Sequence, residues 1–122
     1  RPWQNVIVPA SIIFQIIKKS NENMFDTFNI GPRYKNISVK DIINKLNKIN
    51  NSKVKIKFYD TKESKESRSL KLNINKSKRI FQYPNTSLNY DLNIINEWYI
   101  NSFSEQNMHN FTINQINDYL KK

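Results

Sequence analysis

Residues 38 to 58 read SVKDIINKLNKINNSKVKIKF, and this stretch joins two kinds of regular pattern. Its first part has the spacing of a helix-capping box, with Ser38 as the cap and Asp41 three residues later. The apolar residues that follow recur at helical intervals, at Ile42, Ile43, Leu46 and Ile49. The last part, Val54 to Phe58, alternates apolar residues with lysine, which is typical of a strand with one buried face. A helix followed by a strand predicts an α/β fold.

The same two patterns continue on both sides of this stretch. Apolar periodicity predicts helices over residues 9–19, 75–81, 88–103 and 113–120, the last of them with a second capping box formed by Thr112 and Gln115. Short apolar runs predict strands over residues 24–31, which end at the Gly31-Pro32 turn, and over residues 70–72. We therefore expect residues 1–122 to form one α/β domain with short strands and about five helices.

The composition excludes several kinds of functional site. The 122 residues contain one glycine, Gly31, so a glycine-rich loop that cradles phosphate cannot form. They contain no cysteine and one histidine, His109, which excludes disulfides, thiolate metal sites and a Cys-His pair. Because cysteine is absent, as in many proteins of reducing compartments, we expect a cytoplasmic location. No apolar run approaches the ~20 residues of a membrane span, so we expect no membrane partner.

The formal net charge is +10, and most of it comes from lysine spread along the whole length. Arginine-rich blocks, which are typical of a nucleic-acid-binding arm, do not occur. We interpret most of these lysines as solvated surface. A small basic nucleic-acid-binding module remains the alternative from a different functional class.

The amino end of the chain is Arg1-Pro2-Trp3-Gln4, without a starting methionine or a polar lead. This start predicts that the chain is the later part of a longer protein. A guanidinium group suits a phosphate, and an aromatic neighbour can hold it or stack on a ligand, so Arg1 beside Trp3 indicates anion binding.

Five motifs come in one order at familiar intervals along the chain. They are Arg1-Pro2-Trp3-Gln4, Phe28-Asn29-Ile30-Gly31-Pro32, Leu70-Lys71-Leu72-Asn73 with Lys76, Trp98-Tyr99, and Phe111-Thr112-Ile113-Asn114-Gln115-Ile116. The series resembles the carboxyl-terminal part of the CDP-glucose 4,6-dehydratases, a family of the extended short-chain dehydrogenase/reductase superfamily. The second and third motifs are shared across many nucleotide-sugar epimerases and dehydratases, whereas the first and last point more narrowly to the CDP-glucose enzymes.

The resemblance implies a two-part enzyme, with an amino-terminal Rossmann domain that binds NAD and a smaller part, residues 1–122, that binds the nucleotide of the sugar. In such enzymes NAD takes hydride from the sugar C4, water leaves across C5 and C6, and the hydride returns to C6. The family's glycine-rich turn and its Tyr-x-x-x-Lys pair do not occur in this chain, because no tyrosine here has a lysine four places on. The resemblance therefore implies that no catalytic residue lies in residues 1–122, that these residues alone are inactive, and that the complete enzyme is a homo-oligomer.

Three substrate-binding residues follow from the resemblance. Arg1 matches the arginine that the superfamily places against the sugar-nucleotide pyrophosphate. Trp3 belongs to the same motif and is expected mainly to brace the backbone there. Glu66 matches an acidic position that accepts a hydrogen bond from the nucleotide ribose. The chain departs from the family pattern at three positions in or beside these motifs. Asn5 and Lys65 stand where the family has histidines, and Asn73 stands where it has an aspartate.

The nearest alternative within the enzyme class is a dehydratase or epimerase that acts on another nucleotide sugar. Separation from a Rossmann domain would also expose apolar surface, which we expect around Phe25 and Phe28.

Overall fold

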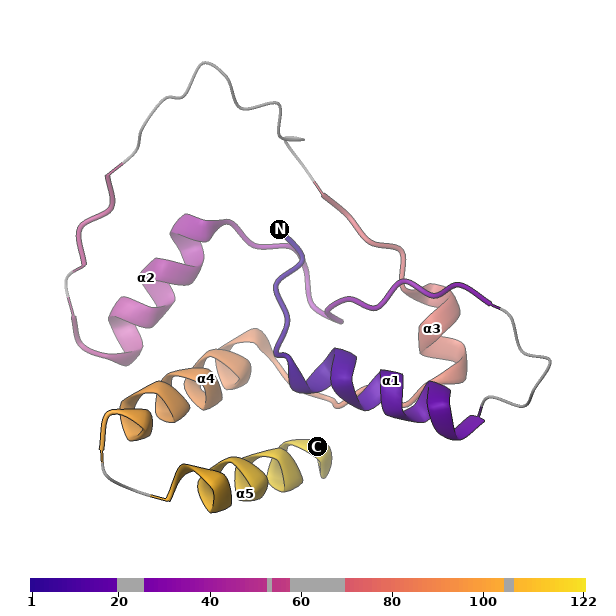
Figure 1. The fold of residues 1–122 in the computed structure, drawn as a ribbon. Helices are drawn as coiled ribbons and strands as arrows, with labels where there is room; N and C mark the ends of the chain where they lie inside the picture. The colour runs from indigo at the N-terminus through magenta and orange to yellow at the C-terminus, as the bar shows by residue number, and fades with distance from the viewer. Residues whose placement is uncertain (20–25, 53, 58–69, 105–106) are drawn as a thin grey trace.

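A computed structural model describes residues 1–19, 26–52, 54–57, 70–104 and 107–122. The described residues form five helices: α1 (Ile7–Lys19), α2 (Val39–Ile49), α3 (Asn75–Ile80), α4 (Leu88–Ser102) and α5 (Met108–Leu120). Figure 1 shows α4 and α5 side by side, with α2 on one side of the pair and α1 and α3 on the other. Within the described ranges there is no strand, so the expected α/β fold with short strands is wrong and the chain is all-helical there.

The three segments expected to be strands have no strand pairing in their described parts, which are residues 26–31, 54–57 and 70–72. Side-chain amides make the connections that a sheet would make between backbones. The amide of Asn29 donates to the carbonyl of Asn73 at 3.3 Å, and the amide of Asn36 donates to the carbonyl of Leu70. A strand needs a repeating backbone ladder, and an asparagine that occupies a backbone carbonyl interrupts such a ladder. Alternating apolar residues therefore lie in extended but unpaired segments.

The helix boundaries mostly agree with the sequence. Ser38 caps α2 as predicted, because its side-chain oxygen accepts from the backbone N–H of Asp41 at 3.1 Å. The second predicted capping box is wrong, because α5 begins at Met108, capped by Asn107, which leaves Thr112 inside the helix. There the Thr112 hydroxyl accepts a hydrogen bond from the indole N–H of Trp98 at 2.9 Å and links α5 to α4.

The main core lies where α1 and α5 meet the segment that follows α3. Its buried members are Val8, Ile12, Phe81 and Tyr119. The ring of Phe28 packs edge-on against Phe81, with 5.1 Å between ring centroids. This contact brings the extended segment after residue 26 against the helical core, so the core positions the segment that carries the Gly-Pro turn.

A buried carboxylate joins three distant parts of the chain. Asp91 in α4 is 2 % exposed, and it accepts hydrogen bonds from the hydroxyl of Tyr34 at 3.0 Å and from the hydroxyl of Tyr119 at 2.8 Å. Because the Tyr119 hydroxyl donates to Asp91, it must accept from the hydroxyl of Thr86, which lies 3.0 Å away. Buried polar groups that are all satisfied fix one arrangement of the elements that carry them.

This cluster predicts a loss of stability in alkali. Burial raises the pKa of Tyr34, the charge of Asp91 raises it further, and burial likewise raises the pKa of Tyr119. In the unfolded chain tyrosine ionises near its ordinary pKa of about 10. Above that pH the unfolded state loses protons that the folded state keeps, so stability should fall by about 1.4 kcal/mol per pH unit for each tyrosine.

Urea denaturation between pH 8 and pH 11 measures this effect, and the double variant Y34F/Y119F is the control. The stability of the parent chain should be flat up to about pH 10 and then fall, since that is where unfolded tyrosine begins to ionise. The variant should start from a lower stability and lose less of it in alkali. An equal alkaline slope in the two proteins would contradict the prediction.

Candidate functional site

The amino-terminal segment is held against the segment that follows the Gly-Pro turn. The amino group of Arg1 donates to the carbonyl of Ile37 at 3.0 Å, and the backbone N–H of Ile37 donates back to the carbonyl of Arg1 at 3.4 Å. Three residues later, the side-chain amide of Gln4 donates to the carbonyl of Ile30 at 3.5 Å. The first and second motifs of the chain therefore lie against each other.

Gly31 allows the third motif to approach. A side-chain carbon added at Gly31 would lie 3.2 Å from side-chain atoms of both Leu72 and Ile74, which is closer than ordinary van der Waals contact. Its backbone does not require glycine, since its φ is not in the left-handed region. Glycine at this position therefore serves the close approach of residues 70–74 to the Gly-Pro turn.

These three segments enclose a surface hollow of about 410 Å³. It is lined by Pro2, Pro32, Tyr34, Lys35, Asn36, Lys71 and Leu72. The lining carries two ammonium groups and no carboxylate, and among the described residues no acidic side chain forms an ion pair with Lys35 or Lys71. This lining favours an anionic ligand with an apolar or planar part, because it combines two lysines and an amide with two prolines. We name this hollow, defined by the seven residues above, the proline hollow.

A second hollow of about 600 Å³ lies at α3, lined by Asn29, Asn73, Asn75, Lys76, Arg79 and Ile80. Its lysine is already neutralised, because the Lys76 ammonium forms an ion pair with Asp26 and lies 4.9 Å from the ring centre of Phe28. The hydrogen bond from Lys76 lowers the pKa of Asp26, and so does the bond from the backbone N–H of Thr27. Of the two cations that line this hollow, Lys76 and Arg79, the first is therefore already paired with an acid.

The structure places the predicted site residues unevenly. Arg1 is exposed and its backbone borders Pro2 of the proline hollow, while Trp3 is 40 % exposed. Glu66 lies outside the described residues. The sequence analysis did not identify Lys35 and Lys71 as site residues, because it predicted only a short strand over residues 70–72 and no site near Lys35. In the sequence, only the positions of these two lysines could have indicated a site. Lys35 follows the Gly-Pro turn, and Lys71 lies within the third motif of the resemblance.

The described residues contain no cluster of side chains suited to a metal ion. No group of three or more histidine, cysteine or acidic side chains in the described ranges could hold a metal ion. His109 lies exposed on α5. Among the helices of the described ranges, none has the length and apolar character needed to cross a membrane. The arrangement that the described residues do offer is a hollow bordered by two lysines, whose charge suits an anion.

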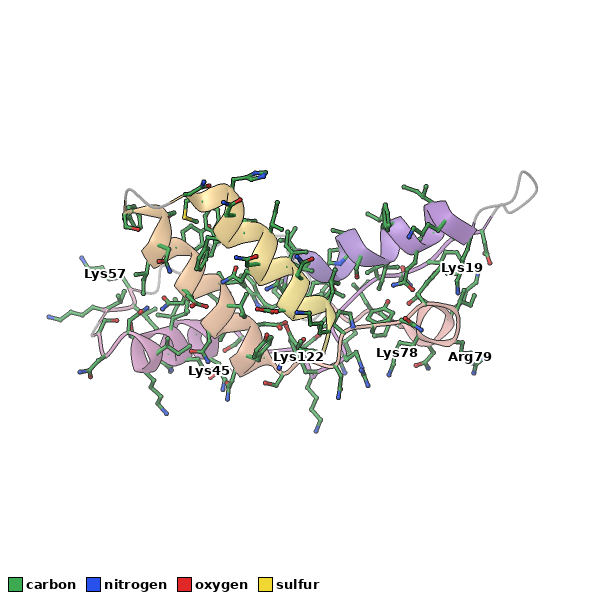
Figure 2. All side chains as sticks on the ribbon, turned by 90° about the horizontal axis from the view of Figure 1, so that it is seen from below. Lys19, Lys45, Lys57, Lys78, Arg79 and Lys122 are labelled. Carbon is green, nitrogen blue, oxygen red and sulfur yellow. The ribbon has the colours of Figure 1, made fainter. Side chains whose placement is uncertain are left out.

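Positive charge is not confined to the proline hollow. Figure 2 shows Lys45, Lys78 and Arg79 along the lower edge of the view, on α2 and α3. They come from two different helices, and of the three only Arg79 lines the hollow at α3, so most of this charge is typical of solvated surface.

No protein-family model, curated protein or solved structure matches this chain. The resemblance noted in the sequence therefore stays a prediction.

Proposed function

We propose that residues 1–122 are the substrate-binding part of a CDP-glucose 4,6-dehydratase-like enzyme. The proposal is supported mainly by one observation. The first three motifs of the resemblance lie far apart in the sequence, yet residues of all three line the proline hollow. The lining of this hollow carries two lysines and no carboxylate, which suits an anionic ligand.

The chemistry of the proline hollow supports a sugar nucleotide as its ligand. A diphosphate carries negative charge at neutral pH, which Lys35 and Lys71 of the hollow can balance. Arg1 precedes the lining residue Pro2 but is not itself a lining residue; its role, which the resemblance implies, is to add the paired donor geometry that fits phosphate oxygens. The amide of Asn36 already donates to a backbone carbonyl, so its oxygen remains to accept from a ligand hydroxyl or amine. In this arrangement the residues bind and orient the substrate, and Trp3 braces the segment that carries Arg1.

NAD does not fit residues 1–122. A dinucleotide site needs a glycine-rich turn between a strand and a helix, but the one glycine of this chain, Gly31, lies in an extended segment packed on Leu72 and Ile74. The proposal therefore assigns NAD to an amino-terminal Rossmann domain of the complete enzyme and assigns no redox or elimination step to this chain.

The test is an assay of the natural protein with NAD and CDP-glucose, followed by mass spectrometry of the sugar nucleotide. We expect loss of one water to give CDP-4-keto-6-deoxyglucose. A panel of other nucleotide sugars, assayed in parallel, identifies the substrate when another nucleotide is preferred. If no nucleotide sugar is converted or bound, the proposal is wrong.

The rival function is nucleic-acid binding, and the basic edge of α2 and α3 is the observation that favours it (Figure 2). Binding to phosphate backbones falls steeply with salt, with a log-log slope of about one per contact. Titration with duplex and single-stranded DNA at rising salt separates the two functions. Absence of binding at low salt removes the rival.

A further inference from the structure

Tyr34 borders two spaces of very different size. It is half-buried and lines the proline hollow, of about 410 Å³. It also lines a cavity of only about 10 Å³, together with Gln4, Thr86 and Asp91 among others. No side chain can turn into so small a space, since protein interiors are closely packed. The side chain of Tyr34 therefore stays beside the proline hollow.

The buried carboxylate of Asp91 fixes the hydroxyl group of Tyr34. One oxygen of Asp91 accepts from Tyr34 at 3.0 Å, and the other accepts from Tyr119 at 2.8 Å. Asp91 belongs to α4 and Tyr119 to α5, two helices that lie side by side (Figure 1). Hydrogen bonds to an ionised group are stronger than those between neutral groups. The tyrosine of the hollow is thus anchored to a pair of packed helices.

The Asp91 carboxylate has hydroxyl partners instead of a cation. It is 2 % exposed, and in the described part of the chain no lysine or arginine forms an ion pair with it. Burying a carboxylate costs free energy that its hydrogen bonds must offset. In return the two hydroxyls are held in fixed positions, and that of Tyr34 belongs to a side chain that borders the proline hollow. The cluster therefore connects the helical core to the hollow.

Tyr34 adds an aromatic ring to a hollow whose other ring side chains are Pro2 and Pro32. The charged lining residues, Lys35 and Lys71, can bind phosphate but cannot recognise a nucleobase, because an ammonium group is a point charge without a flat apolar face. An aromatic ring has such a face, and a base packs on it through apolar contact and stacking. Among the seven residues that define the proline hollow, Tyr34 alone carries an aromatic ring.

We infer that Tyr34 is the residue of the proline hollow on which the nucleobase of the ligand packs, and that Asp91 is the positioning residue that holds Tyr34 for it. This inference rests on the proposed function, which supplies a nucleotide as the ligand. Neither residue belongs to a motif of the resemblance, since Tyr34 comes after Pro32 and Asp91 lies on α4 before Trp98. A ring that is already held in place loses less conformational freedom when the ligand binds.

Isothermal titration of the natural protein with CDP and with inorganic pyrophosphate tests the role of Tyr34. Tyr34→Ala should raise the Kd for CDP about tenfold or more, because the stacking surface is lost. Tyr34→Phe keeps the ring but releases it from Asp91, and it should raise the Kd for CDP about twofold to fivefold. Pyrophosphate, which carries no base, should bind the parent and both variants equally.

Tyr119→Phe is the matched control for the role of Asp91. It removes one hydrogen bond from the same carboxylate, but Tyr119 does not line the proline hollow. It should therefore lower the melting temperature, as Tyr34→Phe does, and leave the Kd for CDP unchanged. Asp91→Ala should raise this Kd as Tyr34→Phe does, and it should add nothing when Tyr34 is already phenylalanine. The two phenylalanine variants alone decide the role of Asp91 when Asp91→Ala does not fold.

The outcomes separate this inference from the proposed function. A natural protein that binds CDP equally well before and after Tyr34→Ala overturns the inference and retains the proposed function. Equal losses of CDP affinity in Tyr34→Phe and Tyr119→Phe overturn the positioning role of Asp91, because the loss would then follow stability rather than the hollow. A natural protein that binds neither CDP nor CDP-glucose overturns both proposals.

Discussion

Replacing Asp91 by alanine should lower the free energy of unfolding by about 2 to 4 kcal/mol, because two buried hydroxyls lose their acceptor and each costs about 1 to 3 kcal/mol when unsatisfied. The carboxylate is 2 % exposed and is the shared acceptor of Tyr34 and Tyr119. Since Tyr119 keeps its hydrogen bond with Thr86, the loss should lie in the lower part of the range for two groups. Urea denaturation of the chain at pH 7 measures the change.

Asp118→Ala is the matched control. Asp118 is also an aspartate in a helix, but it lies exposed on α5, where its ion-pair partner among the described residues is Lys121, at 2.9 Å. Exposed pairs contribute about 0 to 1 kcal/mol, so this variant should be nearly as stable as the parent. If Asp91→Ala cost no more than Asp118→Ala, the carboxylate would not be the acceptor that holds the three segments together.

A double-mutant cycle separates the hydrogen bond of Tyr34 from the rest of the loss. Tyr34→Phe alone should cost about 1 kcal/mol, and it should cost less when Asp91 is already alanine, because the hydroxyl then has no acceptor to lose. Additive losses in the cycle would indicate that the two residues act independently.

The helices could be predicted from the sequence because their signals are local. Ser38 caps α2 three residues before Asp41, and the apolar stripe of that helix begins directly after it. The strands were predicted wrongly, because an alternation of apolar and polar residues shows only that a segment has one buried and one solvent-exposed side. Whether it pairs depends on partners far away, and here Asn29 and Asn36 occupy the carbonyls of Asn73 and Leu70.

The site was predictable only in part for the same reason. Arg1 could be identified because its motif is contiguous. The lysines of the proline hollow could not, since Lys35 and Lys71 are separated by a long stretch of sequence and meet only when Gly31 lets residues 70–74 approach. The Asp91 cluster was equally invisible, because Tyr34 and Tyr119 lie 57 and 28 residues from Asp91. Contacts of this kind are set by tertiary packing, which local patterns do not encode.

Replacing Arg1 by alanine in the complete enzyme should weaken binding of the sugar nucleotide by about 1 to 3 kcal/mol, since one charge-assisted hydrogen-bonded contact to phosphate is lost. This corresponds to about a fivefold to 150-fold rise in the dissociation constant. Isothermal titration with CDP-glucose measures it. Arg79→Ala is the control, because Arg79 carries the same group but lines the hollow at α3 rather than the proline hollow.

The same titration with Lys71→Ala locates the phosphates within the proline hollow. If Arg1 and Lys71 contact one diphosphate, CDP and CDP-glucose should lose affinity together in both variants, and the double variant should lose less than the sum, because groups that share one ligand charge couple. Cytidine, which has no phosphate, should bind the variants and the parent equally. Unchanged affinity for CDP-glucose in Arg1→Ala would contradict the assignment of Arg1. A loss confined to Lys71→Ala would move the anion site to the centre of the proline hollow, with Arg1 outside it.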